Sequence, residues 1–274
     1  MHLWKITLPP LIYKIRGIKM ALINIKFASE VLGRCTDINV IIPQRSTEGQ
    51  IGIENKAGDE KYKCLLLLHG LSDDNTIWLR RTSIERYATE KGIAVVLPSG
   101  DRSFYTNMKY GDRYFDFISD EVLKIAREFL PISEKREDTF VAGLSMGGYG
   151  ALKTGLRKPD KFAACAGLSS VADIDEFMTE LRPQLRECIF GIDDEIPEDD
   201  DLFRLASKMN TSSVKPRIYM GEGTEDFMYD ANVRLKNHFE SLDYDFTYRE
   251  SAGTHCWAFW DEYIQYVLDW MFGE

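Results

Sequence analysis

The run from Val141 to Gly150 contains one serine, Ser145, within the pattern Gly-x-Ser-x-Gly. A serine held on a strained turn between a strand and a helix projects its hydroxyl, and only small residues two positions to either side avoid a collision. Gly143 and Gly147 fill those two positions. The pattern predicts that Ser145 is a nucleophile, which attacks a carbonyl carbon once a base removes the proton of the serine hydroxyl.

The sequence on either side of this pentapeptide decides how the pattern is interpreted. Residues 139–142 have the β-branched and aromatic content of a buried strand, and Ala151, Leu152 and Leu156 recur at helical spacing. A phosphate-binding loop would need a following Gly-Lys-Ser/Thr, which the chain lacks. The context therefore favours a nucleophile on a turn between strand and helix over a phosphate loop or a plain turn.

Four histidines are available to act as the base for Ser145. His2 lies in the N-terminal tail, His238 lies in the middle of a predicted helix, and His69 directly precedes a different functional turn. His255 comes just beyond the last predicted strand, at the sheet edge where Ser145 also emerges. We expect His255 to be the general base, with a core or surface histidine as the alternative.

A carboxylate should orient the imidazole, and in this type of fold it lies between the serine and the histidine in chain order. The turn at residues 221–227 is the candidate position. Spacing alone does not choose among Glu222, Glu225, Asp226 and Asp230, and each has the alternative of an exposed loop acid.

Acyl transfer also needs donors for the oxyanion. The residue after the nucleophile, Met146, should supply one backbone N–H, and Leu71, in the loop after an early strand, should supply the second. Three aromatic residues in predicted loops, Trp78, Tyr105 and Trp257, are candidates to line the acyl or alcohol site, with plain packing as the alternative.

Strand and helix patterns alternate along the rest of the chain. Residues 23–27 and 38–42 alternate apolar with polar residues, as in two antiparallel strands with one wet face. Continuous apolar runs predict buried strands at 64–68, 93–98, 139–144 and 162–168, and further strands are expected at 217–220 and 246–249. Helical stripes occur at 76–91, 118–129, 151–156, 174–185, 231–242 and 260–271. This order predicts a mostly parallel central sheet with an antiparallel N-terminal edge and helices on both faces.

Two segments depart from the alternation. Residues 170–214 interrupt it and predict a small lid, in which seven of the nine residues from Asp193 to Asp201 are acidic. The spacing of a calcium loop is absent, so we expect no metal and a loop that supplies acids to a helix beginning near Leu202. Residues 1–19 carry four basic residues and no acid. We interpret them as an extension outside a single domain at 20–274, with a signal peptide as the alternative.

Charge and cysteine content limit the partners. The chain has 34 basic and 44 acidic residues, a net charge of −10, which disfavours nucleic acid and favours a small neutral or cationic substrate. No run of eighteen apolar residues is present, so no membrane span is expected. Five cysteines without Cys-x-x-Cys spacing predict reduced thiols and a cytoplasmic location. The sequence leaves the oligomeric state open, including a homo-oligomer.

Four segments together resemble the esterase D branch of the α/β-hydrolases, in particular its tributyrin esterase-like bacterial acyl esterases. They are His69-Gly70-Leu71-Ser72, the run from Gly143 to Gly150, the turn at 221–227 and Ala252-Gly253-Thr254-His255-Cys256-Trp257. The resemblance covers the chain from about Met20 onward. It implies an α/β-hydrolase fold, Asp226 as the orienting acid, and hydrolysis of short-chain acyl esters such as acetyl, butyryl or tributyrin-like esters without a cofactor.

Other functions compete with this one. The same branch contains carbohydrate acetyl esterases, feruloyl esterases and S-formylglutathione hydrolases, and the acidic stretch in the lid departs from the family pattern. Transfer of the acyl group to another alcohol is also open. A catalytically silent binding protein on the same fold is the alternative outside enzymes. The presence of all three triad candidates in the expected chain order favours a serine esterase that acts on a small ester.

Overall fold

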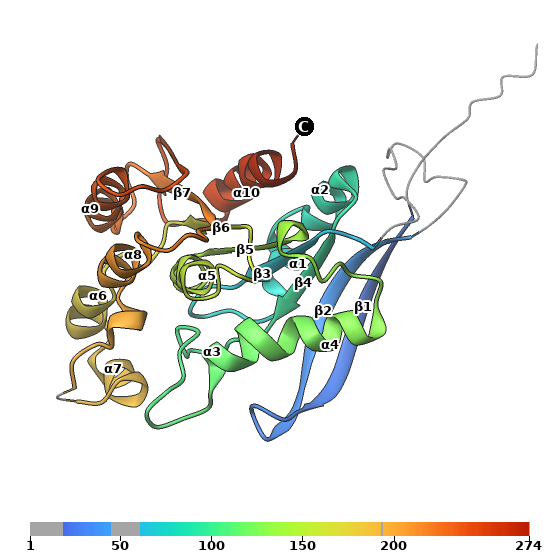
Figure 1. The fold of residues 1–274 in the computed structure, drawn as a ribbon, viewed down its shortest axis with the longest axis horizontal. Coiled ribbons are helices and arrows are strands. Elements are labelled where there is room, and N and C mark those ends of the chain that lie inside the picture. Colours follow the sequence, from blue (N-terminus) through green and yellow to red (C-terminus); the bar gives the residue numbers. More distant parts are fainter. Residues whose placement is uncertain (1–18, 45–60, 193, 274) are drawn as a thin grey trace, which may run out of the picture.

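The computed structural model describes residues 19–44, 61–192 and 194–273, which form one eight-stranded sheet in the order β1-β2-β4-β3-β5-β6-β7-β8 (Figure 1). β1 and β2 pair antiparallel, β2 pairs antiparallel with β4, and the pairings from β4 to β8 are parallel. The predicted mostly parallel sheet with an antiparallel N-terminal edge is confirmed. The strands are β1 Lys19–Ser29, β2 Arg34–Gln44, β3 Cys64–Leu68, β4 Ala94–Pro98, β5 Thr139–Leu144, β6 Ala164–Leu168, β7 Arg217–Gly223 and β8 Phe246–Ser251.

Helices cover both faces of the sheet, as predicted, and each face has its own hydrophobic core. One core packs beneath α4, α5, α8 and α9, and the other beneath α1, α2 and α10, of which α2 and α10 lie together in Figure 1. The α-helices are α1 Ile77–Arg81, α2 Ile84–Lys91, α3 Tyr114–Asp116, α4 Val122–Phe129, α5 Met146–Arg157, α6 Ile174–Leu181, α7 Pro183–Ile189, α8 Leu202–Met209, α9 Tyr229–Glu240 and α10 Trp257–Phe272. Short π and 3₁₀ turns are η1 Phe117–Glu121, η2 Arg136–Asp138 and η3 Glu198–Asp200.

The hydrophobic pattern of each strand follows its place in the sheet. β3, β4, β5 and β6 are buried along their whole length, because helices cover both of their faces. Side chains of β1, at the sheet edge, alternate between partly buried and exposed, as a strand with one solvated face requires. The sheet places the carboxyl ends of β3, β5, β7 and β8 at one edge, where the candidate residues lie.

Two predicted helices are each divided in the structure. The helix expected at 76–91 breaks because Thr82 adopts an extended conformation while its hydroxyl donates to the carbonyl of Trp78 at 2.7 Å. The helix expected at 174–185 ends at Leu181 because Pro183 disfavours helical geometry at the residue before it, and Pro183 then begins α7.

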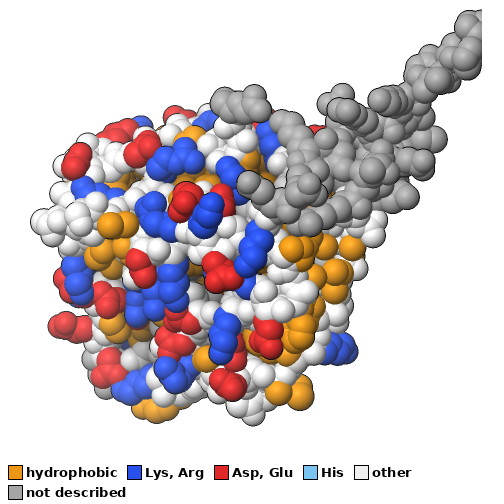
Figure 2. Space-filling view, turned by 45° about the vertical axis from the view of Figure 1, so that its right-hand side comes forward, with side chains coloured by type: hydrophobic (Ala, Val, Ile, Leu, Met, Phe, Trp, Pro, Cys, Tyr) orange, Lys and Arg blue, Asp and Glu red, His pale blue; other side chains and the backbone are white. Residues whose placement is uncertain are grey.

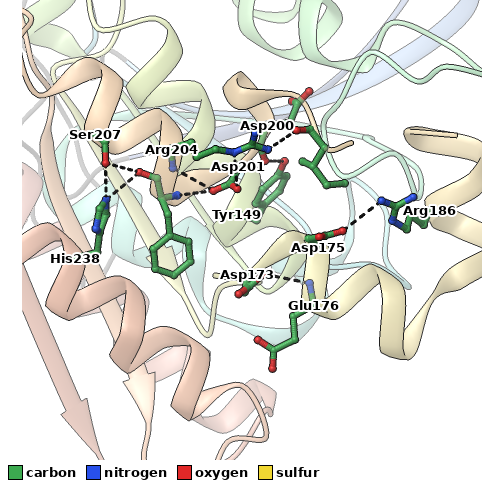
Figure 3. A network of polar contacts seen from close by, with 12 residues as sticks. Tyr149, Asp173, Asp175, Glu176, Arg186, Asp200, Asp201, Arg204, Ser207 and His238 are labelled. Atoms are coloured by element: carbon green, nitrogen blue, oxygen red, sulfur yellow. Dashed lines mark hydrogen bonds and ion pairs between the residues drawn. The ribbon is translucent and has the colours of Figure 1, made fainter. Parts of the chain in front are cut away.

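We define the cap as residues 170–214, which contain α6, α7 and α8 and lie to one side of the sheet, away from the β1–β2 hairpin (Figure 1). The prediction that a loop acid serves the start of a helix near Leu202 is confirmed. The Asp201 carboxylate caps α8 by accepting from the N–H groups of Phe203 and Arg204 (Figure 3). Asp200 attaches the cap to α5: its carboxylate accepts from Lys153 at 2.9 Å, and its carbonyl accepts from the Tyr149 hydroxyl at 2.6 Å.

The surface is rich in charge of both signs. On the face shown in Figure 2, basic and acidic side chains lie beside one another. Across the described residues no helix is both long enough and apolar enough to cross a membrane. All five cysteines are free. The N-terminal extension predicted at residues 1–19 lies, apart from Lys19 in β1, outside the described residues.

Candidate active site

Ser145 lies at the strained turn between β5 and α5. Its backbone has φ 55° and ψ −120°, outside the regions that an ordinary residue adopts, and its N–H donates to the carbonyl of Leu168 at 2.8 Å. A Cβ at position 143 would lie 2.3 Å from the Gly147 carbonyl oxygen, and one at position 147 would lie 2.5 Å from that of Leu68. Both glycines are therefore required sterically, and the turn aims the serine hydroxyl away from the core.

His255 and Asp226 lie next to this hydroxyl. His255 Nε2 is 3.0 Å from Ser145 Oγ, and His255 Nδ1 is 2.8 Å from Asp226 Oδ2. Because a carboxylate only accepts hydrogen bonds, Nδ1 carries the proton and Nε2 is left free to accept from the serine hydroxyl. The loops after β5, β7 and β8 thus bring together three side chains that are far apart in the sequence.

The environment of Asp226 keeps it ionised. Burial alone would raise its pKa, but the hydrogen bond and the charge of His255, together with the Met228 N–H at 3.0 Å, hold the pKa of Asp226 below its ordinary value. The imidazole also contacts two aromatic rings, since those of Phe227 and Trp260 lie 4.9 and 4.8 Å from it, centroid to centroid. The carboxylate and the imidazole are consequently fixed before any substrate binds.

The other acids of this turn lie elsewhere. Glu225 and Asp230 are exposed, whereas Glu222 is completely buried at the end of β7 and its two oxygens have no hydrogen-bond partner among the described residues. Burial, with the charge of nearby Asp226, raises the pKa of Glu222 to about 9. Glu222 is therefore a neutral acid at pH 7, which avoids a second negative charge beside Asp226.

Of the two predicted oxyanion donors, Met146 follows Ser145 directly in the chain and Leu71 lines the same cleft as Ser145. Met146 is the first residue of α5, where a backbone N–H has no carbonyl partner within the helix, and Leu71 lies in the loop that lines the cleft above Ser145. His69 supports this loop: its Nε2 accepts from the Gly100 N–H at 2.8 Å, and its Nδ1 lies 2.7 Å from the Gly70 carbonyl oxygen. Burial lowers the pKa of His69, so the ring is neutral and bridges two loops.

A cleft of about 930 Å³ opens above Ser145. Its wall is largely apolar and includes Phe104, Phe177 and Leu181 from the loop after β4 and from the cap. Trp257 lines this cleft. The interpretation of Trp78 and Tyr105 as rim residues is wrong, because both side chains are buried beneath it.

Hydrogen bonds account for the buried positions of those two aromatic residues. The Trp78 indole N–H donates to the Leu68 carbonyl at 3.0 Å, and the Tyr105 hydroxyl donates to the His69 carbonyl at 2.8 Å. Both therefore brace the end of β3 beneath the cleft, where an amphipathic aromatic ring can bury its body and still satisfy its polar group.

Comparison with known proteins places this geometry in a family. The model of the Esterase family matches residues 29–268. The chain belongs to the Esterase family. An acetyl esterase from Caldicellulosiruptor saccharolyticus is 33% identical to this esterase over 264 residues, which cover 92% of this chain and 98% of that protein.

Solved structures agree with the family. Fluorophosphonate-binding serine hydrolase F of Staphylococcus aureus superposes with a TM-score of 0.84 at 33% identity, covering 93% of this esterase and 99% of that chain. An S-formylglutathione hydrolase from the same organism gives 0.80 at 34% identity, covering 92% and 99%. The protein is a serine esterase with an α/β-hydrolase fold, so the predicted enzyme class and fold are confirmed.

Sequence reasoning missed three features of the site. The buried state of Glu222 and the bridging role of His69 depend on what packs around each side chain, and neither has a sequence signal beyond its place at the end of a strand. Arg102 and Arg182 both line the cleft, and their meeting there depends on contacts between the loop after β4 and the cap, which are far apart in the sequence.

Proposed function

We propose that this esterase hydrolyses short-chain acyl esters with Ser145 as nucleophile, His255 as general base and acid, and Asp226 as the orienting carboxylate. The observation that supports the proposal most is the continuous line of contacts from Asp226 through His255 to Ser145, at 2.8 and 3.0 Å, on the floor of a cleft. The geometry meets the requirement of a base within hydrogen-bond reach of the proton that it removes.

The reaction proceeds in two halves. Ser145 Oγ attacks the ester carbonyl carbon while its proton passes to His255 Nε2, and the N–H groups of Leu71 and Met146 stabilise the oxyanion. The bond to the alcohol breaks as His255 returns the proton to the leaving oxygen. Water then attacks the acyl-serine, gives a proton to His255, and the serine oxygen leaves with that proton to release the carboxylic acid.

The proposed acyl group is short. The acetyl esterase relative supports an acetyl group, and the side chains of Phe177, Leu181 and Trp257 form apolar walls that suit a short hydrocarbon chain. We place the protein in the esterase D branch on the motifs at residues 69–72, 143–150, 221–227 and 252–257.

Replacement of the nucleophile tests the proposal. Ser145→Ala should lower kcat for 4-nitrophenyl acetate and butyrate by roughly 10⁵- to 10⁶-fold, because the remaining groups then act without a covalent intermediate. Ser72→Ala, at an exposed serine of the same cleft, is the matched control and should keep turnover within about twofold. A fluorophosphonate probe should label the parent and the Ser72→Ala variant but leave Ser145→Ala unlabelled. Normal turnover by Ser145→Ala would refute the proposed nucleophile.

A second candidate substrate is S-formylglutathione, a thioester. The 34% identical structural neighbour that covers 99% of its own chain is named for that activity. Comparing kcat/KM for S-formylglutathione with that for 4-nitrophenyl acetate separates the two. A value at least about a hundredfold higher for the thioester would assign the chain to that reaction instead.

A further inference from the structure

The cleft above Ser145 contains two arginines that come from different parts of the fold. Arg102 lies in the loop after β4, and Arg182 lies at the turn between α6 and α7 of the cap. The contact between Phe104 and Phe177, whose ring centroids are 5.7 Å apart, joins the same loop to the same cap helix. Both guanidinium groups are exposed to solvent and line the space that a substrate would occupy.

Neither arginine has an acidic partner among the residues that the structure describes. No carboxylate oxygen of these described residues lies within 4.0 Å of either guanidinium, and Arg182 donates only to the carbonyl of its neighbour Leu181, at 2.6 Å. Other arginines in and beneath the cap are paired, for example Arg157 with Asp200 and Arg186 with Asp175. No described carboxylate therefore competes for the guanidinium groups of the two cleft arginines.

The charge of the cleft differs in sign from that of the whole chain. The protein carries a net charge of −10, yet among the described residues the charged side chains that line the cleft, apart from His255, are Arg102, Arg182 and one acid, Asp73. The charges of the two arginines attract an anion toward the cleft, and because both side chains are exposed this attraction should be strongest at low salt. The net charge of the whole chain favoured a neutral or cationic substrate, but the charge at this cleft has the opposite sign.

We propose that Arg102 and Arg182 form an anion-binding subsite and that the preferred substrates are esters carrying a carboxylate. The proposal rests on the proposed ester hydrolysis at Ser145 and specifies its substrate class. A guanidinium presents a planar fork of donors that matches the two oxygens of a carboxylate, so an exposed arginine can select this group without a preformed cage. Arg102 from the loop after β4 and Arg182 from the cap would then hold the charged end, while the apolar wall receives the rest.

Two pairs of probes test the subsite, and each pair differs only in charge. 3-Acetoxybenzoate and 3-acetoxybenzamide share the acetyl group and carry the carboxylate, or its neutral isostere, on the leaving phenol. Phenyl hydrogen succinate and phenyl succinamate share the phenol and carry the difference on the acyl side. The measurement is kcat/KM for each ester at low and high ionic strength, in the parent enzyme and in Arg102→Gln, Arg182→Gln and the double variant.

The charge preference for a pair is kcat/KM for the charged ester divided by kcat/KM for the neutral ester. At low salt we expect this preference to be about tenfold higher in the parent enzyme than in the double variant, for at least one pair. High salt should reduce this preference, because the arginines are exposed. The neutral member should keep its kcat/KM within about twofold in every variant. Arg86→Gln is the matched control, because Arg86 is an exposed arginine on α2, outside the cleft, and its loss should leave the preference unchanged.

The outcomes separate this inference from the proposed function. Turnover of the neutral esters with the same charge preference in the parent and the double variant would overturn the anion subsite and leave ester hydrolysis standing. Failure to hydrolyse any of the four esters would contradict the proposed reaction and the subsite with it. The pair that shows the larger preference identifies whether the carboxylate belongs to the acyl group or to the alcohol.

Discussion

The sheet edge that carries Ser145 and the cap that covers it are held in place by different means. At the edge, side chains are buried or nearly so, and glycines leave so little space that a single added carbon would collide with backbone. The cap packs into the same core through buried side chains such as Ile174 and Leu202, but its outer surface carries exposed ion pairs, such as Lys208 with Asp199 (Figure 3 shows part of this region). Exposed pairs contribute roughly 0 to 1 kcal/mol each.

This difference indicates which property each region sets. Close packing fixes distances to a few tenths of an ångström, which a proton relay requires. Exposed ion pairs contribute little to stability, so side chains at the surface of the cap and in its cleft wall can change with little effect on the sheet. We therefore expect changes at the edge to abolish chemistry, and changes in the cap to alter substrate preference or stability.

Among the changes that compare the sheet edge with the cap, Asp226→Asn should have the largest effect, and it tests the sheet edge. The amide keeps the shape of the side chain but does not hold the imidazole in the required tautomer, so kcat should fall roughly 10³- to 10⁴-fold. The matched control is Glu225→Gln, an exposed acid one residue away, which should leave kcat within about twofold. Steady-state kinetics with 4-nitrophenyl acetate measures both, and equal losses would mean that Asp226 has no special role.

The next effect concerns Lys153, the buried anchor of the cap. Its ammonium contacts Asp200 at 2.9 Å and the Thr106 hydroxyl at 2.6 Å, and burial lowers the pKa of Lys153 to about 8. Lys153→Met leaves Asp200 with Arg157 alone, which should lower the free energy of unfolding by about 3 kcal/mol. Lys208→Met, at an exposed pair of the cap, should not change it measurably. Denaturant titration measures the free energy of unfolding of both variants. Equal values for the two would show that the buried pair does not anchor the cap.

Glu222→Gln tests whether the acid behind Asp226 is neutral. The pKa of Glu222 is raised to about 9 in the folded protein, above its ordinary 4.5, so only the unfolded chain loses the proton near neutral pH. Its stabilising contribution is complete below about pH 4.5 and is lost as the pH rises through about 9. Glutamine does not titrate, so the variant should gain about 2 kcal/mol relative to the parent between about pH 6 and about pH 7.5.

The measurement is the free energy of unfolding of both proteins at the two pH values, with kcat/KM expected to remain within about twofold. Glu250→Gln is the control, because Glu250 lies opposite Glu222 on β8 and is exposed. A pH dependence that is the same in Glu222→Gln and in the parent would show that Glu222 is already ionised near neutral pH.

The smallest effect should follow Phe177→Ala in the cap wall. Removal of this ring enlarges the cleft, so the ratio of kcat/KM for 4-nitrophenyl hexanoate to that for the acetate should rise about threefold. Phe129→Ala removes a ring that is 61% exposed on α4, outside the cleft, and should leave the ratio unchanged. An unchanged ratio in Phe177→Ala as well would mean that the cap does not limit acyl length.

The sequence predicts the sheet better than the cap for a physical reason. Short apolar runs such as Cys64–Leu68 favour buried strands because of their length and the glycine that follows, and the glycines beside Ser145 require a tight turn, so these local patterns carry most of the information. The helix breaks at Thr82 and Pro183 depend on a hydroxyl competing with the backbone and on the restriction before a proline. The burial of Glu222 and the entry of Arg182 into the cleft depend on packing between distant segments, and no local pattern encodes it.

The most direct test of the account is to identify the residue that carries the acyl group during turnover. The enzyme would be mixed with 4-nitrophenyl acetate, quenched with acid in the pre-steady state, and digested for peptide mass spectrometry. The account predicts one acetyl group on the peptide that contains Ser145 and none in the Ser145→Ala variant. Acetyl on another residue that forms and decays at the turnover rate, or turnover without any acylated peptide, would contradict it.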